Sequence, residues 1–324
     1  MNPRWAVNQL RNGMGLRPGE RVLAIVDEPL RAAGEALCAA ARALGAGRAE
    51  VRVVPAVTGA APTAPGPALA IVPSAFMRQV SKADVIISLM SGLDLQRESP
   101  LLRAGLAAFR SAGRGRWAAG ACIDLGVVEE DLAFHCLAIA EATAAMAARL
   151  ARASRVRLVT EAGTDLTFSI AGRPVHQDPG VLRSPGAYGN LPAGEAFVAP
   201  LETSAEGKAV IDLSIGDIPL DEPVALTFRA GRVVAVAGGA AARELERRLG
   251  QPDTNSGAWT LGEFGVGTNP GARLRGRAPL DEKAAGTAHI ALGGNTHFGG
   301  ANEAETHYDC VLSQPVIYLD GEKL

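Results

Sequence analysis

Alternating strand and helix signals near the N-terminus constrain the fold of this chain more than any other feature. Residues 21–27 (RVLAIVD) are typical of a strand, residues 29–47 of an Ala-rich helix that ends at glycine, and residues 49–55 (AEVRVVP) of a second strand. A strand, a helix and a strand in so short a segment form a βαβ unit with parallel strands and a right-handed crossover. We therefore expect a parallel sheet in this part of the chain.

The same alternation continues toward the middle of the chain. Further strands are expected at residues 83–92 and 116–123, with a helix at 101–113 between them and a long helix from Glu129 to Ala153. The loop after the first strand lacks the glycine fingerprint of dinucleotide-binding proteins. We therefore expect no dinucleotide cofactor.

Beyond residue 154 the pattern changes to strands and turns. Residues 155–173 are typical of a β-hairpin, residues 207–216 and 224–238 of further antiparallel strands, and one helix is expected at 241–250. The expected fold class is α/β. An N-terminal βαβ parallel-sheet domain, residues 1–154, is followed by a mixed, mainly antiparallel α+β domain, residues 155–324.

Composition limits the classes of partner. The 324 residues carry a formal net charge of −2, with charges of both signs interspersed, so neither nucleic-acid nor membrane binding is expected. No apolar run has the length of a signal peptide or of a membrane span, and we expect a cytoplasmic protein. The four cysteines have no paired spacing, which indicates reduced, buried thiols.

Histidines and carboxylates gather near the C-terminus. His307 and Asp309 lie two residues apart, so one face of a strand presents both side chains, and His289 lies in an apolar strand pattern, TAHIALG. Imidazole and carboxylate suit zinc, cobalt, manganese or ferrous iron, and the absence of any CxxC pair favours an open site over a closed thiolate site. Each residue alone is more often structural, but their combination predicts a metal site.

Four ordered motifs carry a family resemblance. YGNLPAGEAFVAP, LGEFGVGTNP, LDEKAAGTAHIALG and ETHYD resemble the conserved blocks of the aminopeptidase T family of metallopeptidases. The resemblance implies a hydrolase that cleaves an amide or peptide bond with metal-activated water, two divalent ions (Zn, Co or Mn) and a homodimer. It implies that the metal ligands are Glu195, Glu263, His289, His307 and Asp309. The substrate would be a small molecule or a short peptide.

One position departs from that family. Thr296 stands where the family has a catalytic tyrosine, and His297 follows it. An imidazole titrates near neutral pH, so His297 is a candidate general acid or base or an oxyanion donor, and it is alternatively a loop histidine without a catalytic role. We expect His297, Glu195 and Glu263 to be the catalytic residues. Lys283 and Arg273 are either ligands for a substrate carboxylate or solvated charges.

A second family offers an alternative function. The segments GGNTHFGG and VIYLDGEKL resemble the 2,5-dihydroxypyridine dioxygenases, which use one ferrous ion to open an aromatic ring. That family has a histidine where this chain has Glu263, and it lacks the block around Glu195. These two positions favour the hydrolase, with the Fe(II) dioxygenase as the alternative and a non-catalytic binding protein as a further one.

Overall fold

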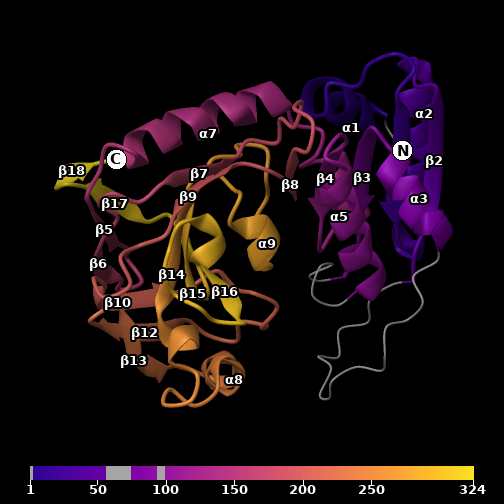
Figure 1. Cartoon of the computed structure of the whole chain (residues 1–324). Helices are drawn as coiled ribbons and strands as arrows, with labels where there is room; N and C mark the ends of the chain where they lie inside the picture. The colour runs from indigo at the N-terminus through magenta and orange to yellow at the C-terminus, as the bar shows by residue number, and fades with distance from the viewer. Residues whose placement is uncertain (1–2, 56–73, 93–98) are drawn as a thin grey trace. The chain divides into compact units, whose positions relative to one another are not determined.

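The computed structural model describes residues 3–55, 74–92 and 99–324 (Figure 1). Contacts divide the chain into two units, the first comprising residues 1–140 and 179–193 and the second residues 141–178 and 194–324. These limits differ from the expected boundary after residue 154, because residues 141–154 belong to the second unit and residues 179–193 to the first. Whether residues 1–154 and 155–324 are the folding domains stays a prediction.

A five-stranded parallel sheet forms the framework of the first unit. Its strand order is β2-β1-β3-β4-β8, so the strands that flank β1 are β2 and β3. The expected parallel sheet is confirmed. The strands are β1 (Arg21–Val26), β2 (Arg48–Val53), β3 (Val85–Leu89), β4 (Arg116–Gly120) and β8 (Tyr188–Leu191).

Helices cover both faces of the parallel sheet because its central strands β1 and β3 are almost continuously apolar and buried. Leu23 and Ile25 of β1 pack in one cluster with Phe76 and Phe109, which come from α3 and α5. The other face of β1 meets α2, where Gly34 lies against Val26. The helical segments are α1 (Arg4–Val7), η1 (Asn8–Gly13), η2 (Glu28–Leu30), α2 (Arg31–Ala43), α3 (Ser74–Lys82), α5 (Pro100–Ala112) and α6 (Leu125–Glu129).

The long helix expected from Glu129 to Ala153 is interrupted. The structure has α6 (Leu125–Glu129), a turn, and then α7 (Cys136–Leu150). Asn8 donates hydrogen bonds to the carbonyl oxygens of Leu132 and Phe134, at 3.3 and 2.5 Å, and Gln9 donates to that of Leu132 at 2.9 Å. Because side chains far away in sequence bind these carbonyl groups, the helix begins only after them. Helix α3 and the pairing of β8 with β4 were also not expected.

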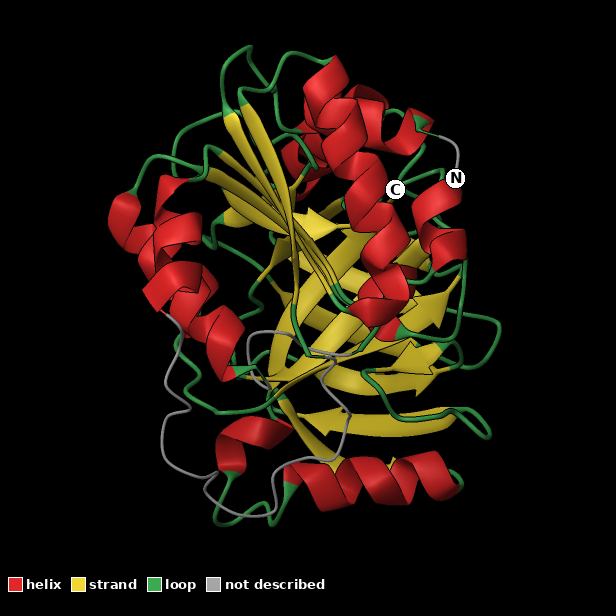
Figure 2. Ribbon diagram, turned by 90° about the vertical axis from the view of Figure 1, so that its right-hand side faces the viewer, coloured by secondary structure: helices red, strands yellow, loops and turns green. Residues whose placement is uncertain are grey.

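Two antiparallel sheets make up most of the second unit, and Figure 2 shows their strands in yellow. The seven-stranded sheet has the order β13-β12-β10-β6-β5-β17-β18 and the six-stranded sheet β11-β16-β15-β14-β9-β7. The first contains β5 (Arg155–Val159), β6 (Asp165–Ser169), β10 (Glu206–Ile211), β12 (Val224–Arg229), β13 (Arg232–Ala237), β17 (Val316–Leu319) and β18 (Glu322–Lys323). The second contains β7 (Val175–Asp178), β9 (Glu195–Val198), β11 (Ser214–Ile215), β14 (Leu261–Gly267), β15 (Thr287–Gly293) and β16 (His307–Ser313). Short helices lie between successive strands of these sheets, namely α8 (Ala240–Leu249), η3 (Ser256–Trp259), α9 (Ala278–Asp281) and η4 (Thr296–Phe298).

The core of the second unit contains side chains from both sheets. Phe168 of β6 meets Phe264 of β14 with ring centroids 5.2 Å apart, and Ile290 and Leu312 belong to the same buried cluster. Since strand side chains alternate between faces, the neighbours of these residues in β14, β15 and β16 point to the opposite face. The expected fold class, a parallel-sheet part followed by a mainly antiparallel part, is therefore confirmed. Among the described residues, no helix is long and apolar enough to cross a membrane.

Candidate metal centre

Four neighbouring strands present the predicted metal ligands on one face of the six-stranded sheet. The face opposite the core carries Glu195 at the start of β9, Glu263 in β14, His289 in β15, and His307 and Asp309 in β16. These strands are adjacent in the order β16-β15-β14-β9, so residues distant in sequence become neighbours. The structure thus brings all five residues together, while their role as ligands stays a prediction.

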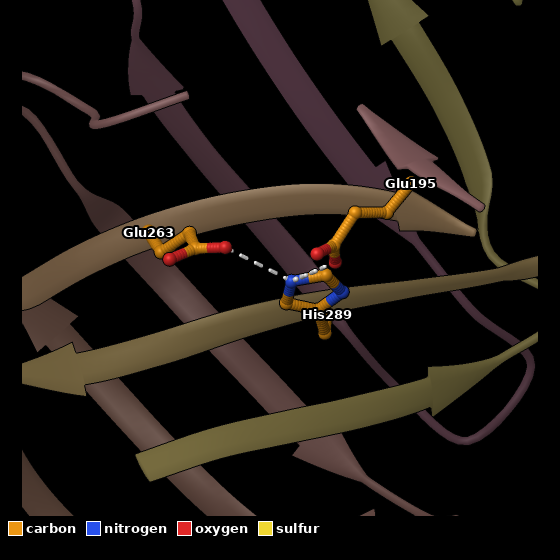
Figure 3. Close-up of side chains that lie close together, drawn as sticks. All are labelled: Glu195, Glu263 and His289. Atoms are coloured by element: carbon orange, nitrogen blue, oxygen red, sulfur yellow. Dashed lines mark hydrogen bonds and ion pairs between the residues drawn. The ribbon is translucent and has the colours of Figure 1, made fainter. Parts of the chain in front are cut away.

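Glu263 lies at the centre of this group. Its Oε1 is 3.2 Å from Nε2 of His289, and its Oε2 is 3.2 Å from Nε2 of His307. Asp309 Oδ1 lies 3.2 Å from the same His307 nitrogen, and Glu195 Oε2 lies 3.5 Å from His289 Nε2. Figure 3 shows Glu195 and Glu263 directed toward the imidazole of His289.

The tautomer of His307 follows from its second nitrogen. Nδ1 lies 2.9 Å from the carbonyl oxygen of Gly294, which accepts hydrogen bonds only, so Nδ1 donates. In the neutral ring, Nε2 then has its lone pair directed at two carboxylates. Metal-binding histidines commonly donate their other N–H to a backbone carbonyl in this way. The local geometry of His307 therefore fits a metal ligand.

His289 occupies its position because a glycine faces it. Gly265 of β14 stands directly opposite His289 of β15, and the imidazole ring lies across the glycine. His289 is only 1% exposed, and its Nδ1 has no hydrogen-bond partner among the described residues. This buried ring has few alternative orientations.

Two further charged residues belong to the cluster, and sequence reasoning missed one and misplaced the other. Lys283 was expected to bind substrate or to be solvated, but it is 2% exposed and contacts Glu195 and Glu282. Glu282 is the residue that the sequence motifs missed, although its position beside Lys283 in the D-E-K triplet before the His289 strand is a usable signal. Both follow α9 directly, which places them next to β9.

The carboxylates of the cluster stabilise the protonated form of its two histidines. Although burial disfavours the charged ring, its hydrogen bond to Glu263 and the nearby carboxylates raise the pKa of His289 to about 9. The pKa of His307 is likewise well above its usual value, because the attraction of Asp309 outweighs burial. Burial raises the pKa of Glu282 to about 8. Imidazoles that hold a proton among carboxylates occupy the kind of site where a divalent cation would displace that proton.

Three overlapping groups in this cluster have ligand atoms within 4.8 Å of one another. Their oxygen and nitrogen donors suit a divalent transition metal. The side chains of His307 and Asp309 are 19% and 26% exposed, whereas that of His289 is 1% exposed, so among the described residues the cluster is most accessible to solvent at His307 and Asp309, its open end. The groups are Glu195, Glu263 and His289; Glu263, His307 and Asp309; and Glu282, His289 and Asp309.

An aromatic cluster adjoins the open end of the site. The ring of His297, in η4, is exposed and its centroid lies 6.3 Å from that of His307. Phe298 is buried beside both rings, and its carbonyl oxygen lies 3.0 Å from Nε2 of His176. The structure thus places His297 beside the predicted metal ligands. Its catalytic role stays a prediction.

Together, the fold and the donor set define a two-unit α/β protein with a cluster of histidines and carboxylates, which could hold a metal ion, on an antiparallel sheet. A sequence profile of 2,5-dihydroxypyridine 5,6-dioxygenase matches residues 133–324, more than half of the chain. The chain therefore belongs to the 2,5-dihydroxypyridine 5,6-dioxygenase family.

Individual relatives agree with this assignment. The 2,5-dihydroxypyridine 5,6-dioxygenase of Pseudomonas putida KT2440 is 28% identical over an alignment of 191 residues, which covers 53% of this chain and 53% of the relative. The matched part thus spans about half the length of that relative. The structure of 2,5-dihydroxypyridine dioxygenase from Pseudomonas putida KT2440 is similar with a TM-score of 0.72 and 21% identity, over 99% of this chain and 94% of that one.

The hydrolase expectation is wrong. AmpT from Thermus thermophilus is similar in structure, with a TM-score of 0.67 over 99% of this chain and 96% of that one, but at 21% identity the likeness shows a shared fold alone. The family match contradicts the expected amide or peptide hydrolysis and the description as an aminopeptidase or metallopeptidase. Both solved structures share this fold, so the fold alone does not distinguish the hydrolase from the dioxygenase.

Proposed function

We propose that this protein is a metal-dependent dioxygenase that opens the ring of a small dihydroxylated aromatic compound, with 2,5-dihydroxypyridine as the first candidate substrate. The observation that carries the proposal is the extent of the family match, because residues 133–324 include every side chain of the metal cluster. This is the function that the sequence offered as its alternative.

The donor set supports one ferrous ion. His289 and His307 flank the carboxylate of Glu263, and two imidazoles with one carboxylate are the donors that non-haem ferrous oxygenases use. Asp309, beside His307, is a further donor. When bound, a ferrous ion supplies the one-electron chemistry that lets dioxygen react with an electron-rich ring. Zinc, cobalt or manganese, and a pair of ions, were expected for the hydrolase and are not part of this proposal.

The partial exposure of His307 and Asp309 gives the substrate its direction of approach. A flat aromatic ring reaches the cluster at this open end, since His289 and Glu195 are buried at the other. His297 is exposed beside His307 and takes the proposed role of accepting a proton from a substrate hydroxyl. Gly294 holds the His307 ring through its carbonyl oxygen and so fixes the orientation of the nitrogen that faces the site.

Oxygen uptake tests the proposal. Protein reconstituted with ferrous iron under argon should consume oxygen with 2,5-dihydroxypyridine in equimolar amounts, with loss of the ring absorbance. Anaerobic samples and His307→Ala should show neither change. His135→Ala is the matched control, because His135 is exposed and precedes α7 in the first unit.

Oxygen consumption with a panel of dihydroxylated aromatic compounds can contradict the proposal. Iron-loaded protein that consumes no oxygen with 2,5-dihydroxypyridine, hydroquinone or 2,5-dihydroxybenzoate would contradict ring cleavage. The homodimer and the small-molecule substrate stay predictions. Light scattering would test the homodimer, and the substrate panel would test the small-molecule substrate.

A further inference from the structure

Lys283 is a buried ammonium group surrounded by carboxylates. Its Nζ donates to Glu195 Oε1, lies 2.9 Å from Glu282 Oε1 and lies 3.7 Å from Asp178 Oδ2. Its side chain is 2% exposed. An ammonium has three hydrogens, and its three carboxylate neighbours come from three segments of the chain, namely β9, the residue after α9, and the end of β7. Lys283 therefore has a defined orientation.

The backbone fixes Lys283 before any metal binds. Its carbonyl oxygen accepts a hydrogen bond from the N–H of Asn269 at 2.8 Å, and its own N–H donates to the carbonyl of Leu280 at 3.2 Å. Asn269 is fully buried. The backbone of Lys283 is thus held by contacts outside the cluster of predicted metal ligands.

The two carboxylate oxygens of Glu195 have different surroundings, because only one of them contacts Lys283. Oε1 binds the ammonium, whereas Oε2 is buried, has no hydrogen-bond partner among the described residues and lies 3.5 Å from His289 Nε2. In the register of β7 and β9, Asp178 stands opposite Glu195, so one amine reaches both carboxylates. With Oε1 held, rotation of the carboxylate away from His289 would break the bond to Lys283.

We infer that Lys283 is a positioning residue of the metal centre: it holds Glu195 by Oε1 and so presents Oε2 to a metal ion bound beside His289. The inference rests on the metal site of the proposed function but not on ring cleavage. Groups that orient ligands in this way typically contribute tenfold to a hundredfold to metal affinity. A lysine that only neutralised buried charge would affect folding without acting through Glu195.

Cobalt(II) binding tests the inference without activity. Cobalt affinity and the visible d–d spectrum would be measured in wild-type protein, Lys283→Met, Glu195→Gln and the double variant. Lys283→Met should weaken cobalt binding by about tenfold to a hundredfold and change the spectrum. Lys208→Met is the matched control, because Lys208 is exposed on β10, and it should change neither.

The double variant decides whether Lys283 acts through Glu195. If it does, Lys283→Met should have little further effect on cobalt affinity in the Glu195→Gln protein. An equal, additive effect in both backgrounds would overturn the inference, as would unchanged affinity in Lys283→Met. Wild-type protein that binds no cobalt or ferrous iron would instead overturn the proposed function together with the inference.

A conservative substitution keeps the test decisive if Lys283→Met does not fold. Lys283→Arg retains the charge but places it differently, so it should weaken cobalt binding in the wild-type background and not in Glu195→Gln. Equal weakening in the two backgrounds would contradict a role through Glu195. Thermal unfolding of each metal-free variant separates loss of stability from loss of affinity.

Discussion

Gly265 lies directly opposite His289 in the antiparallel pair β14 and β15, and a Cβ atom at position 265 would lie 2.1 Å from Cε1 of the imidazole. No side chain other than hydrogen fits there while the ring keeps its place. A glycine on one strand thus determines where a predicted metal ligand on the next strand can lie.

Gly265→Ala should displace His289 and weaken metal binding. Overpacking of this kind typically costs about 1–3 kcal/mol of unfolding free energy. Urea unfolding of the metal-free protein and cobalt titration would measure the two effects. In a His289→Ala background the added methyl group should cost less, because the ring that it meets is gone. Gly265→Ala protein with wild-type cobalt affinity would contradict the assignment of His289.

His307→Ala and Asp309→Ala should each reduce bound metal. The two side chains share one face of β16 and contact each other at 3.2 Å, so each loss removes a donor at the open end of the site. We expect cobalt affinity to fall by more than about tenfold, with the far-ultraviolet circular dichroism unchanged. Metal analysis would check this against His135→Ala. Full metal content in both single variants would rule out this pair as ligands.

Lys283→Met should destabilise the metal-free protein. Removal of one partner from a buried ion pair typically costs about 3–5 kcal/mol, because Glu195 and Glu282 would remain buried without their cation. Urea unfolding would measure the difference from wild-type protein, with Lys208→Met as the control for removal of an exposed charge. A decrease in unfolding free energy of less than about 1 kcal/mol would show that other groups neutralise the charge of these carboxylates.

Two buried thiols should make stability fall at alkaline pH. Burial raises the pKa of Cys38 and Cys136 to about 11, whereas an unfolded thiol titrates near 8.5. The native state holds these protons more tightly, so this stability is complete below about pH 8.5 and is lost as the pH rises toward 11. Each thiol contributes roughly 3 kcal/mol to the free energy of unfolding, because a tenfold difference in proton affinity between the native and the unfolded state corresponds to about 1.4 kcal/mol.

Urea midpoints between pH 8 and pH 11 would test this pH dependence. The Cys38→Ala/Cys136→Ala variant provides the control, because its lysines and tyrosines titrate as in the wild type. It should lose less stability over this range. Identical slopes for both proteins would contradict the prediction.

Local patterns in the sequence determined most of the fold. The βαβ signals at residues 21–55 appear as β1, α2 and β2, because apolar periodicity and turn residues act within a few positions. The alternation in TAHIALG likewise predicted the face of His289, since Ala288, Ile290 and Leu292 are in the core. The spacing of His307 and Asp309 placed both on one face of β16.

The function was not determined by the same patterns. The motifs around Glu195 and Glu263 favoured the hydrolase, and the family match over residues 133–324 contradicted it. Side chains that bind a metal recur in proteins of different chemistry, because the reaction depends on the metal and on the substrate that reaches it. The segments GGNTHFGG and VIYLDGEKL carry the resemblance to the dioxygenases.

Only the tertiary structure decided which charges meet. Lys283 and Glu195 are 88 residues apart, and their contact depends on β9, α9 and the backbone bond of Asn269. The break before α7 similarly depends on Asn8 and Gln9, which bind carbonyl groups more than 120 positions away. The sequence specified the residue types and the strand faces, whereas strand order and long-range hydrogen bonds, which no local pattern encodes, assembled them into one buried cluster.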